Sequence, residues 1–442
     1  MSISTPNAIS TPRTSPTITT DALIIGFGKG GKTLAAKLSA AGRKVVVAEA
    51  SADMYGGTCI NIGCLPSKSL ILSAEQARRD GANSTPETRE AAFEAAIKEK
   101  RRVTSMLRDK NYHKLADQDN ITVITGRAHF TGPHSVEIAT AEGPVAVTAS
   151  KIFINTGATP RIPDIPGIHT TPGVYTSTGL MDLDDMPQRL VIIGSGFIGL
   201  EFASMFADFG TAVTVLQHNA EFLPREDADV AAAIRAQLEA QGVKFLFNAD
   251  TKAIAPAADG GVRLSVAVKG MTRGASQACD SAPAGTGNAH TDITGATDAT
   301  DTTTTTSPTS NPTDHATMSH VQTKPSDDGE PRFAEPAEAR FCLTTDAVLV
   351  ATGRTPNVEG LHLEAAGVEL TERGAVKVDE LLRTTAADIW ALGDVNGGPQ
   401  HTYISLDDYR VVWSQLNGSD RPYTVKDRKH VPSSTFLATP YS

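Results

Sequence analysis

A glycine-rich loop between an apolar strand and a helix occurs twice in this chain, and it limits the possible folds more than any other feature. Each copy reads as strand, loop, helix and second strand, over 22–48 and again over 189–216. The glycines occupy the positions of a G-x-G-x-x-G loop: Gly26, Gly28 and Gly31 in the first copy, and Gly194, Gly196 and Gly199 in the second. Such glycines allow a tight turn and let the backbone approach a pyrophosphate, which the N-terminus of the following helix stabilises. The chain is therefore predicted to bind two dinucleotides.

The residue after the second strand of each copy indicates how the ribose of the dinucleotide is held. Glu49 has this position in the first copy, and Gln217 has the same position in the second. A carboxylate there accepts hydrogen bonds from an adenosine ribose and repels a 2′-phosphate, whereas a neutral amide excludes neither form. We therefore expect a free ribose in the first unit, while the second unit leaves NADH and NADPH open.

Two of the four cysteines, Cys59 and Cys64, follow the first unit closely. A pair at this spacing is compatible with half of a zinc site, a structural disulfide or a redox-active disulfide. Zinc sites of this kind use two such pairs, and the sequence has no second one. Apolar residues over 69–77 predict a helix after the pair, and a helix N-terminus favours a thiolate. Because a dinucleotide unit lies on either side, the redox disulfide is the favoured interpretation.

Length and charge exclude several classes of function. A chain of 442 residues predicts two or three domains, and 50 acidic against 40 basic side chains give a net charge of −10. This charge argues against nucleic acid or an anionic membrane as the main partner, and no apolar run in the sequence is long enough to span a membrane. Residues 1–20 are rich in Ser, Thr and Pro without an apolar core, so we expect a disordered tail and a cytoplasmic protein.

A stretch of low complexity, about 270–339, interrupts the second half of the chain. It is dense in Thr, Ser, Asp, Gly, Ala and Pro, and strands are predicted on either side of it, at 262–268 and 341–345. We therefore expect a disordered insertion at the tip of a hairpin, where added loop length costs little free energy. Its Cys279 and its histidines are too scattered for metal ligands, so no metal site is predicted.

Taken together, these motifs resemble those of the flavin-dependent pyridine nucleotide–disulfide oxidoreductases. The resemblance covers about residues 21–442 apart from the insertion. It is carried by the two glycine loops, the cysteine segment 56–68, the Thr-Gly-Arg-Thr-Pro-Asn segment 352–357 and the Leu-Gly-Asp segment 392–394. Within the family, residues 400–410 look most like the branch that contains a copper(II) reductase of reactive-chlorine resistance, in a group with mercuric reductase and lipoamide dehydrogenase.

The resemblance implies an α/β fold with two Rossmann-like dinucleotide-binding domains, the NAD(P) domain being inserted into the FAD domain. The FAD domain would comprise 21–160 and 356–425, and the NAD(P) domain 161–355. Segments 155–160 and 351–356 echo each other and would be the two passages between the domains. Residues 426–442 would begin an interface domain that is otherwise missing, with its His–Glu acid/base pair. This weakens the expectation of the homodimer that the family forms.

The resemblance also implies roles for single residues. Electrons would pass from NAD(P)H to FAD and on to the Cys59–Cys64 disulfide, with Cys64 facing the flavin and Cys59 facing the substrate. Lys68 and Glu201 would form an ion pair beside the flavin ring, and the helix that starts near His401 would point its positive end at the flavin. FAD would be held at Gly26, Gly28, Gly31 and Glu49, and NAD(P)H at Gly194, Gly196, Gly199 and Gln217. The other expected cofactor contacts are Gly57, Thr58, Lys68, Thr156, Gly157, Gly353, Asp394, His401 and Thr402.

The predicted function is electron transfer from NAD(P)H through FAD and the disulfide to a small-molecule or metal-ion acceptor. This acceptor would be a disulfide, copper(II) or mercury(II), or another oxidant. Two alternatives stay open at this point. One is a truncated FAD-binding protein without full reductase activity, and the other is an NAD(P)H oxidase or redox sensor that passes electrons to oxygen.

Overall fold

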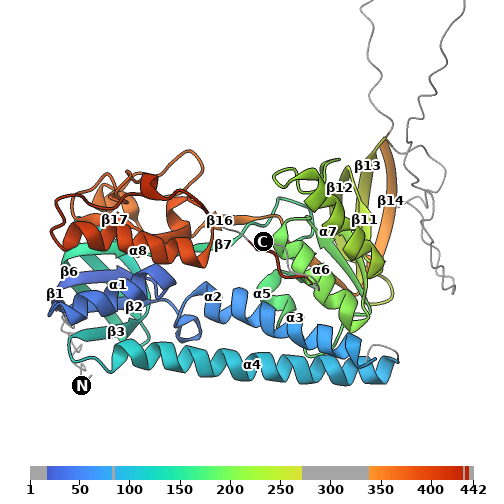
Figure 1. The fold of residues 1–442 in the computed structure, drawn as a ribbon, viewed down its shortest axis with the longest axis horizontal. Coiled ribbons are helices and arrows are strands. Elements are labelled where there is room, and N and C mark those ends of the chain that lie inside the picture. Colours follow the sequence, from blue (N-terminus) through green and yellow to red (C-terminus); the bar gives the residue numbers. More distant parts are fainter. Residues whose placement is uncertain (1–16, 82–84, 271–337, 432–433, 438–442) are drawn as a thin grey trace, which may run out of the picture.

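Each glycine unit lies within its own sheet, and the two sheets are the centres of two lobes (Figure 1). The structure is a computed structural model that describes residues 17–81, 85–270, 338–431 and 434–437. The first unit lies in the lobe that also holds the last long helix, α8 (Thr402–Leu416). The second unit lies in the other lobe.

The first sheet has seven strands, in the order β3-β2-β1-β6-β5-β4, with β17 also paired to β6. These strands are β1 (Thr17–Ile25), β2 (Val45–Glu49), β3 (Ile121–Thr125), β4 (Arg127–Gly132), β5 (Ser135–Thr140), β6 (Gly143–Ile154) and β17 (Ile389–Ala391). β2 is buried along its whole length, as its apolar run requires in a parallel sheet covered on both faces. β17 joins this sheet only after the chain has formed the second sheet. The second domain is therefore inserted into the first, which confirms the predicted fold class.

β1 begins at Thr17, inside the segment 1–20 that the sequence assigns to a disordered tail. Residues 17–20 pair in parallel with 146–149 of β6. The tail prediction is wrong for these four residues because their pairing partner is distant in the sequence and leaves no local signal. Residues 1–16 lie outside the described part of the chain.

The second sheet follows the order β11-β10-β9-β15-β8. Its strands are β8 (Val174–Tyr175), β9 (Arg189–Ile193), β10 (Ala212–Leu216), β11 (Lys244–Leu246) and β15 (Ala347–Val350). Its helices are α5 (Ser177–Leu180), α6 (Phe197–Phe209) and α7 (Ala228–Ala240). All its strand pairs are parallel, as expected for a dinucleotide-binding unit.

A three-stranded antiparallel sheet packs against the second sheet through a shared apolar core. It consists of β12 (Ala249–Pro256), β13 (Val262–Lys269) and β14 (Glu338–Thr345). β13 and β14 pair as far as Lys269 and Glu338. The low-complexity segment therefore connects the two strands of a hairpin at its tip, as predicted, and 271–337 lie outside the described residues.

The two echoing segments of the sequence form the passage between the lobes. β7 (Ala158–Pro160) and β16 (Arg354–Pro356) pair in antiparallel fashion, and Figure 1 shows this ribbon between the two lobes. The chain enters the second domain along β7 and returns along β16. This arrangement agrees with the predicted passages.

Helix α4 (Pro86–Ala116) runs beneath both lobes, and α3 (Cys64–Arg79) lies above it, beneath the second lobe (Figure 1). They share an apolar core with α6, in which Phe93 of α4 meets Phe209 edge to face at 5.4 Å. Arg78 of α3 also pairs with Asp208 of α6 at 2.9 Å. The redox cysteines at the start of α3 are therefore joined to the second domain by packing and charge.

The other helices are short or flank the first sheet. They are α1 (Lys29–Ala40), α2 (Thr58–Asn61) and the 3₁₀ turns η1 (Ala52–Met54), η2 (Leu363–Ala366), η3 (Gly393–Asn396) and η4 (Val425–Asp427). Within the described ranges, no helix combines the length and the apolar character that crossing a membrane requires.

Candidate active site

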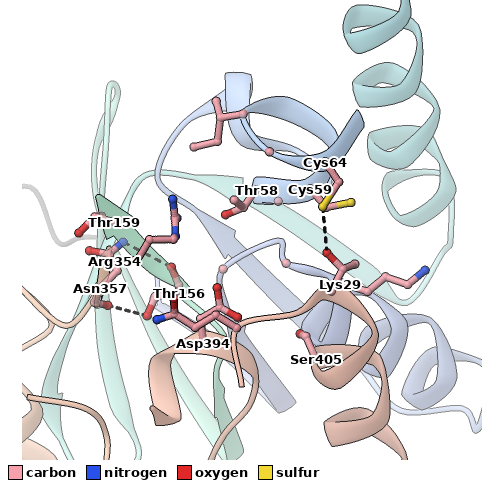
Figure 2. Close-up of a pocket in the computed structure, with 18 of the residues that line it drawn as sticks. Lys29, Thr58, Cys59, Cys64, Thr156, Thr159, Arg354, Asn357, Asp394 and Ser405 are labelled. Atoms are coloured by element: carbon pink, nitrogen blue, oxygen red, sulfur yellow. Dashed lines mark hydrogen bonds between the residues drawn. The ribbon is translucent and has the colours of Figure 1, made fainter. Parts of the chain in front are cut away.

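A cavity of about 2200 Å³ lies between the two lobes and is lined from both glycine loops. The predicted residues that line it are Gly26, Gly28, Glu49, Gly57, Thr58, Cys59, Cys64, Lys68, Thr156, Gly157, Gly196, Glu201, Gly353, Asp394, His401 and Thr402. Figure 2 shows Cys59 and Cys64 on one side of this cavity and Asp394 on the other. Four predicted residues, Gly31, Gly194, Gly199 and Gln217, are not among those that line it.

The first glycine loop is packed tightly against Asn155 at the end of β6. A Cβ at Gly26, whose φ is +103°, would lie 2.4 Å from the backbone oxygen of Asn155. The Gly31 N–H donates to Asn155 Oδ1 at 2.8 Å, and Asn155 Nδ2 donates to the Leu392 carbonyl at 2.7 Å. Gly31 therefore allows helix α1 to approach the strands and does not face the cavity.

Glu49 lines the cavity and also supports the loop. Its Oε2 accepts the Phe27 N–H at 2.9 Å, and its Oε1 accepts the Ser51 N–H at 3.3 Å. Burial raises the pKa of Glu49, and these backbone donors oppose the rise. Since a carboxylate has about four lone-pair sites, Glu49 retains capacity for a ribose hydroxyl, and that role stays a prediction.

Cys59 and Cys64 are both free thiols, Cys59 partly buried and Cys64 exposed toward the cavity. A hydrogen bond from the Cys64 thiol lowers the pKa of Cys59 to about 6, with smaller help from Lys32 and Lys68. The same hydrogen bond, together with burial, raises the pKa of Cys64. The pair therefore loses one proton readily, and the expected roles of Cys64 toward a flavin and of Cys59 toward a substrate stay predictions.

The Cys64 thiol also touches helix α8. Its Sγ lies 3.7 Å from the Thr402 hydroxyl oxygen, and Thr402 is the first residue of that helix. The helix begins where the sequence predicts, so its positive end points at this part of the cavity. Helix α3 itself begins at Cys64, earlier than the predicted 69, and no acidic residue occupies its first turn.

The wall that faces the cysteines carries Asp394 and Arg354 (Figure 2). Burial raises the pKa of Asp394 and lowers the pKa of Arg354, and each charge opposes the shift of the other. The loop before Asp394 is held by Asp408, a fully buried carboxylate that accepts the Gly393 N–H at 2.6 Å and pairs with Arg428. This network fixes the position of Asp394.

Lys68 and Glu201 do not form the predicted direct ion pair. In the part of the chain that the structure describes, Lys68 has no ion-pair partner, and its Nζ lies 3.6 Å from the centre of the Phe436 ring. The Phe436 N–H donates to Glu201 Oε1 at 3.0 Å. The C-terminal segment 434–437 contacts both side chains, which the local sequence around neither residue reveals. The ion pair of Lys68 and Glu201 beside a bound flavin stays a prediction.

The second glycine loop resembles the first but is less enclosed. A Cβ at Gly199 would lie 2.2 Å from the Gly194 oxygen, so Gly199 permits close helix packing, whereas a Cβ at Gly196 would meet nothing within 4 Å. The Gln217 amide is engaged within the domain: its Oε1 accepts the Ser195 hydroxyl at 2.8 Å, and its Nε2 donates to the Glu221 carbonyl. A ribose contact for Gln217 stays a prediction.

Sequence reasoning missed several residues of this site. Asn155 and Asp408 hold the two loops of the first domain, and Phe436 contacts Lys68. Lys32 is a further case: its Nζ donates to the Gly56 carbonyl at 3.0 Å and to Asn111 Oδ1 at 2.6 Å, and burial lowers its pKa to about 8. Its place one residue after the G-x-G-x-x-G loop was the only signal, because its partners lie in other elements.

Both glycine loops fit the phosphates of a dinucleotide. Gly28 and Gly196 are the N-cap residues of α1 and α6, with no side chain capping either helix N-terminus and no acidic residue in the first turn. The partial positive charge of each helix end is therefore not neutralised by the protein. A two-lobed fold with two such loops and a dithiol between them defines a two-dinucleotide oxidoreductase of the disulfide-reductase type.

Comparisons with known proteins agree with this class. Residues 20–295 and 301–408 match the family model of pyridine nucleotide-disulphide oxidoreductases. The chain is 41% identical over 421 residues to a probable pyridine nucleotide-disulfide oxidoreductase, RclA, of Escherichia coli, covering 95% of this chain and 76% of that protein. It is 28% identical to mercuric reductase of Staphylococcus aureus, covering 94% of this chain and 62% of that protein.

A solved structure is similar throughout. The Cu(II) complex of the HOCl-induced flavoprotein disulfide reductase RclA from E. coli aligns with a TM-score of 0.74 and 41% identity, over 96% of this chain and 76% of that one. The chain belongs to the pyridine nucleotide-disulphide oxidoreductase family. It is accordingly an FAD-dependent oxidoreductase that uses NAD(P)H, which confirms the predicted enzyme class and cofactors.

Proposed function

We propose that this protein delivers the electrons of NAD(P)H through the Cys59–Cys64 pair to a metal ion with affinity for sulfur, copper(II) in the first instance. The observation that carries the proposal is the position of two free thiols, one of them exposed, in a cavity shared by both glycine loops. This position supports a relay between a bound cofactor and an acceptor from solution.

The electron balance requires two metal ions for each nucleotide. FAD, when bound, would supply the two-electron transfer between NAD(P)H and the disulfide. The disulfide takes up these two electrons and two protons to give the Cys59 and Cys64 thiols. Oxidation back to the disulfide releases two electrons and two protons, and each copper(II) takes one electron to become copper(I). One proton is therefore released overall for each NAD(P)H oxidised.

Each residue of the chain has a defined part in this proposal. Gly26, Gly28 and α1 would hold the FAD phosphates, and Gly196 and α6 those of NAD(P)H. Cys64 would face the flavin, where the Thr402 hydroxyl and the start of α8 stabilise negative charge on its sulfur. Cys59, the partly buried thiol, would deliver electrons outward to the acceptor.

A metal acceptor is favoured over a disulfide substrate by two considerations. Copper(I) and mercury prefer soft sulfur donors, and the two cysteines supply such donors. The similar proteins also include a flavoprotein whose structure is a Cu(II) complex and mercuric reductases.

We further infer that the reaction takes place in the cytoplasm, where a closely spaced cysteine pair is usually catalytic rather than structural. Association with a second copy, as in the family that the sequence resembles, is an expectation that the molar mass of the FAD-loaded protein in solution would test.

The decisive experiment supplies FAD-loaded protein with NADH or NADPH and copper(II) under anaerobic conditions. Nucleotide oxidation and copper(I) formation, the latter followed with a copper(I)-specific chelator, are expected in a ratio of one to two. Cys64→Ser should abolish copper(I) formation. Nucleotide oxidation that needs oxygen and survives in the variant would instead identify an oxidase, and absence of flavin reduction by both nucleotides would exclude reductase activity.

A further inference from the structure

Lys32 is a partly buried lysine of helix α1 that the proposed electron path does not use. Its Nζ donates to the Gly56 carbonyl at 3.0 Å and to Asn111 Oδ1 at 2.6 Å. Both acceptors are uncharged, and within the described ranges no carboxylate is among the groups that act on this ammonium. Burial of an ammonium costs free energy unless an opposing charge lies nearby, so such a charge has to be looked for.

The contacts of Lys32 join the loop before Cys59 to two helices. Lys32 belongs to α1 and Asn111 to α4, so one ammonium ties the Gly56 carbonyl to both. Lys32 is not among the residues that line the cavity, so this ammonium is directed at the loop and not at the space for the cofactors. The start of the cysteine segment is therefore held from behind by a positive charge.

The opposing charge for Lys32 comes from the cysteine pair. Burial and the neighbouring charges of Lys29 and Lys114 lower the pKa of Lys32 to about 8, although a negative charge on Cys59 raises it. These charged groups face Lys32 from its own helix, from α4 and from α2. Because only the reduced pair can carry a negative charge, the attraction is present in the dithiol and absent in the disulfide.

We propose that Lys32 is a positioning residue that holds the loop before Cys59 and, through its charge, favours the reduced form of the Cys59–Cys64 pair. A cysteine pair is more readily reduced when a nearby cation stabilises its thiolate form. The inference deepens the proposed function, on which its meaning for electron delivery to a metal ion rests.

The first test measures the reduction equilibrium of the pair. The full chain, with FAD bound and again without it, is equilibrated with glutathione buffers, and thiol labelling with mass spectrometry gives the fraction of disulfide. Lys32→Met removes the charge at similar length and should lower the equilibrium constant for reduction roughly threefold to tenfold. Lys32→Arg retains the charge and should keep most of the original value. An unchanged constant in Lys32→Met overturns the proposal.

Two further variants separate charge from structure. Lys32→Gln retains an N–H donor for the Gly56 carbonyl but carries no charge, so it should shift the equilibrium as Lys32→Met does, and it replaces that variant should Lys32→Met not fold. A constant in Lys32→Gln equal to that of the unsubstituted protein contradicts a role for the charge. Lys37→Met removes an exposed lysine from the last turn of the same helix and is the matched control, with no expected shift.

The second test uses the reverse effect, since coupling between two sites is reciprocal. Oxidation of the pair removes its negative charge, so the pKa of Lys32 should fall and more of its amine should be neutral. Acetylation of Lys32 relative to Lys37, followed by peptide mass spectrometry at neutral pH, should be roughly twofold to threefold faster in the oxidised protein. Cys59→Ser should give the same increase under reducing conditions. Equal acetylation in all three forms contradicts the coupling.

Neither test uses a nucleotide or copper. A protein that does not reduce copper can therefore still show the effect of Lys32 on the cysteine pair, and a copper reductase can still lack it.

Discussion

The two glycine units share one scaffold but support their loops differently. In each unit, the residue after the second strand binds the middle of its own loop. Glu49 accepts the backbone N–H of Phe27, and Gln217 accepts the side-chain hydroxyl of Ser195. The same position therefore supports the loop in both units, and the predicted ribose contact would be an additional role.

The surroundings of the two loops differ more than the loops themselves. In the first unit, the Gly31 N–H donates to the Asn155 side chain, and the Gly30 N–H donates to the Ser405 hydroxyl. Gly57 also packs against Gly28. In the second unit, Ala351 has the place that Asn155 has in the first, and the Cβ position of Gly196 is open. An enclosed loop suits a cofactor that stays bound, and an open loop suits a nucleotide that exchanges in every turnover.

The largest expected effect tests this difference directly. Gly28→Ala places a Cβ 2.6 Å from Asn155 Oδ1 and 3.3 Å from the Asn155 backbone oxygen, and should destabilise the protein by about 3 kcal/mol, with loss of bound FAD. Gly196→Ala should leave both nearly unchanged. Urea unfolding and flavin content measure the two effects. Equal losses in both variants would mean that the loops are equally enclosed.

Asn155→Ala should have the next largest effect. It leaves the buried Gly31 N–H and Leu392 carbonyl without partners, at a cost of about 2–3 kcal/mol. The loss should appear in the urea midpoint and in a faster release of FAD. Ala351→Gly, at the corresponding position of the second unit, is the control and should not affect FAD. A stable Asn155→Ala protein that retains its flavin would contradict the supporting role of this side chain.

Gln217→Glu should shift nucleotide preference by about tenfold in kcat/KM toward NADH, because a carboxylate at this position repels a 2′-phosphate. Its stability should change little, since a glutamate oxygen can still accept the Ser195 hydroxyl. Steady-state rates with both nucleotides measure the shift. If the ratio does not move, the end of β10 does not contact the ribose.

The smallest effect concerns pH. Burial raises the pKa of Glu49, so the folded state holds this proton more tightly than the unfolded chain. Stability from this group is fully present below its ordinary pKa and is lost as pH rises through the folded value. Glu49→Gln should therefore flatten the pH dependence of unfolding in this range. A steeper dependence in the variant would mean that the backbone donors outweigh burial.

The sequence predicted well whatever depends on local pattern. The two glycine loops need small residues at fixed spacing, and the strands around them need continuous apolar runs, so 22–48 and 189–216 were recognisable without any tertiary information. The same holds for the Cys59–Cys64 pair and for the hairpin on either side of the low-complexity segment. The inserted order of the domains was implied by the resemblance to the family.

Contacts between distant segments were beyond such reasoning. Residues 17–20 became part of β1 because 146–149 pair with them, and Gln217 turned toward Ser195. Lys68 and Glu201 were expected to meet, yet the segment 434–437 reaches both. Each of these outcomes depends on which surfaces the fold brings together. The amino-acid composition near each residue does not indicate those contacts.

The sequence by itself therefore determined the class of chemistry, because dinucleotide loops and a closely spaced cysteine pair are set by backbone geometry and short spacing. The tertiary structure alone decided how charge is distributed at the site. Asp408, Asn155 and Phe436 come from parts of the chain far from the residues they contact. Burial and direct contact fix whether a charge is paired, shared or left free, and both arise only when the chain is folded.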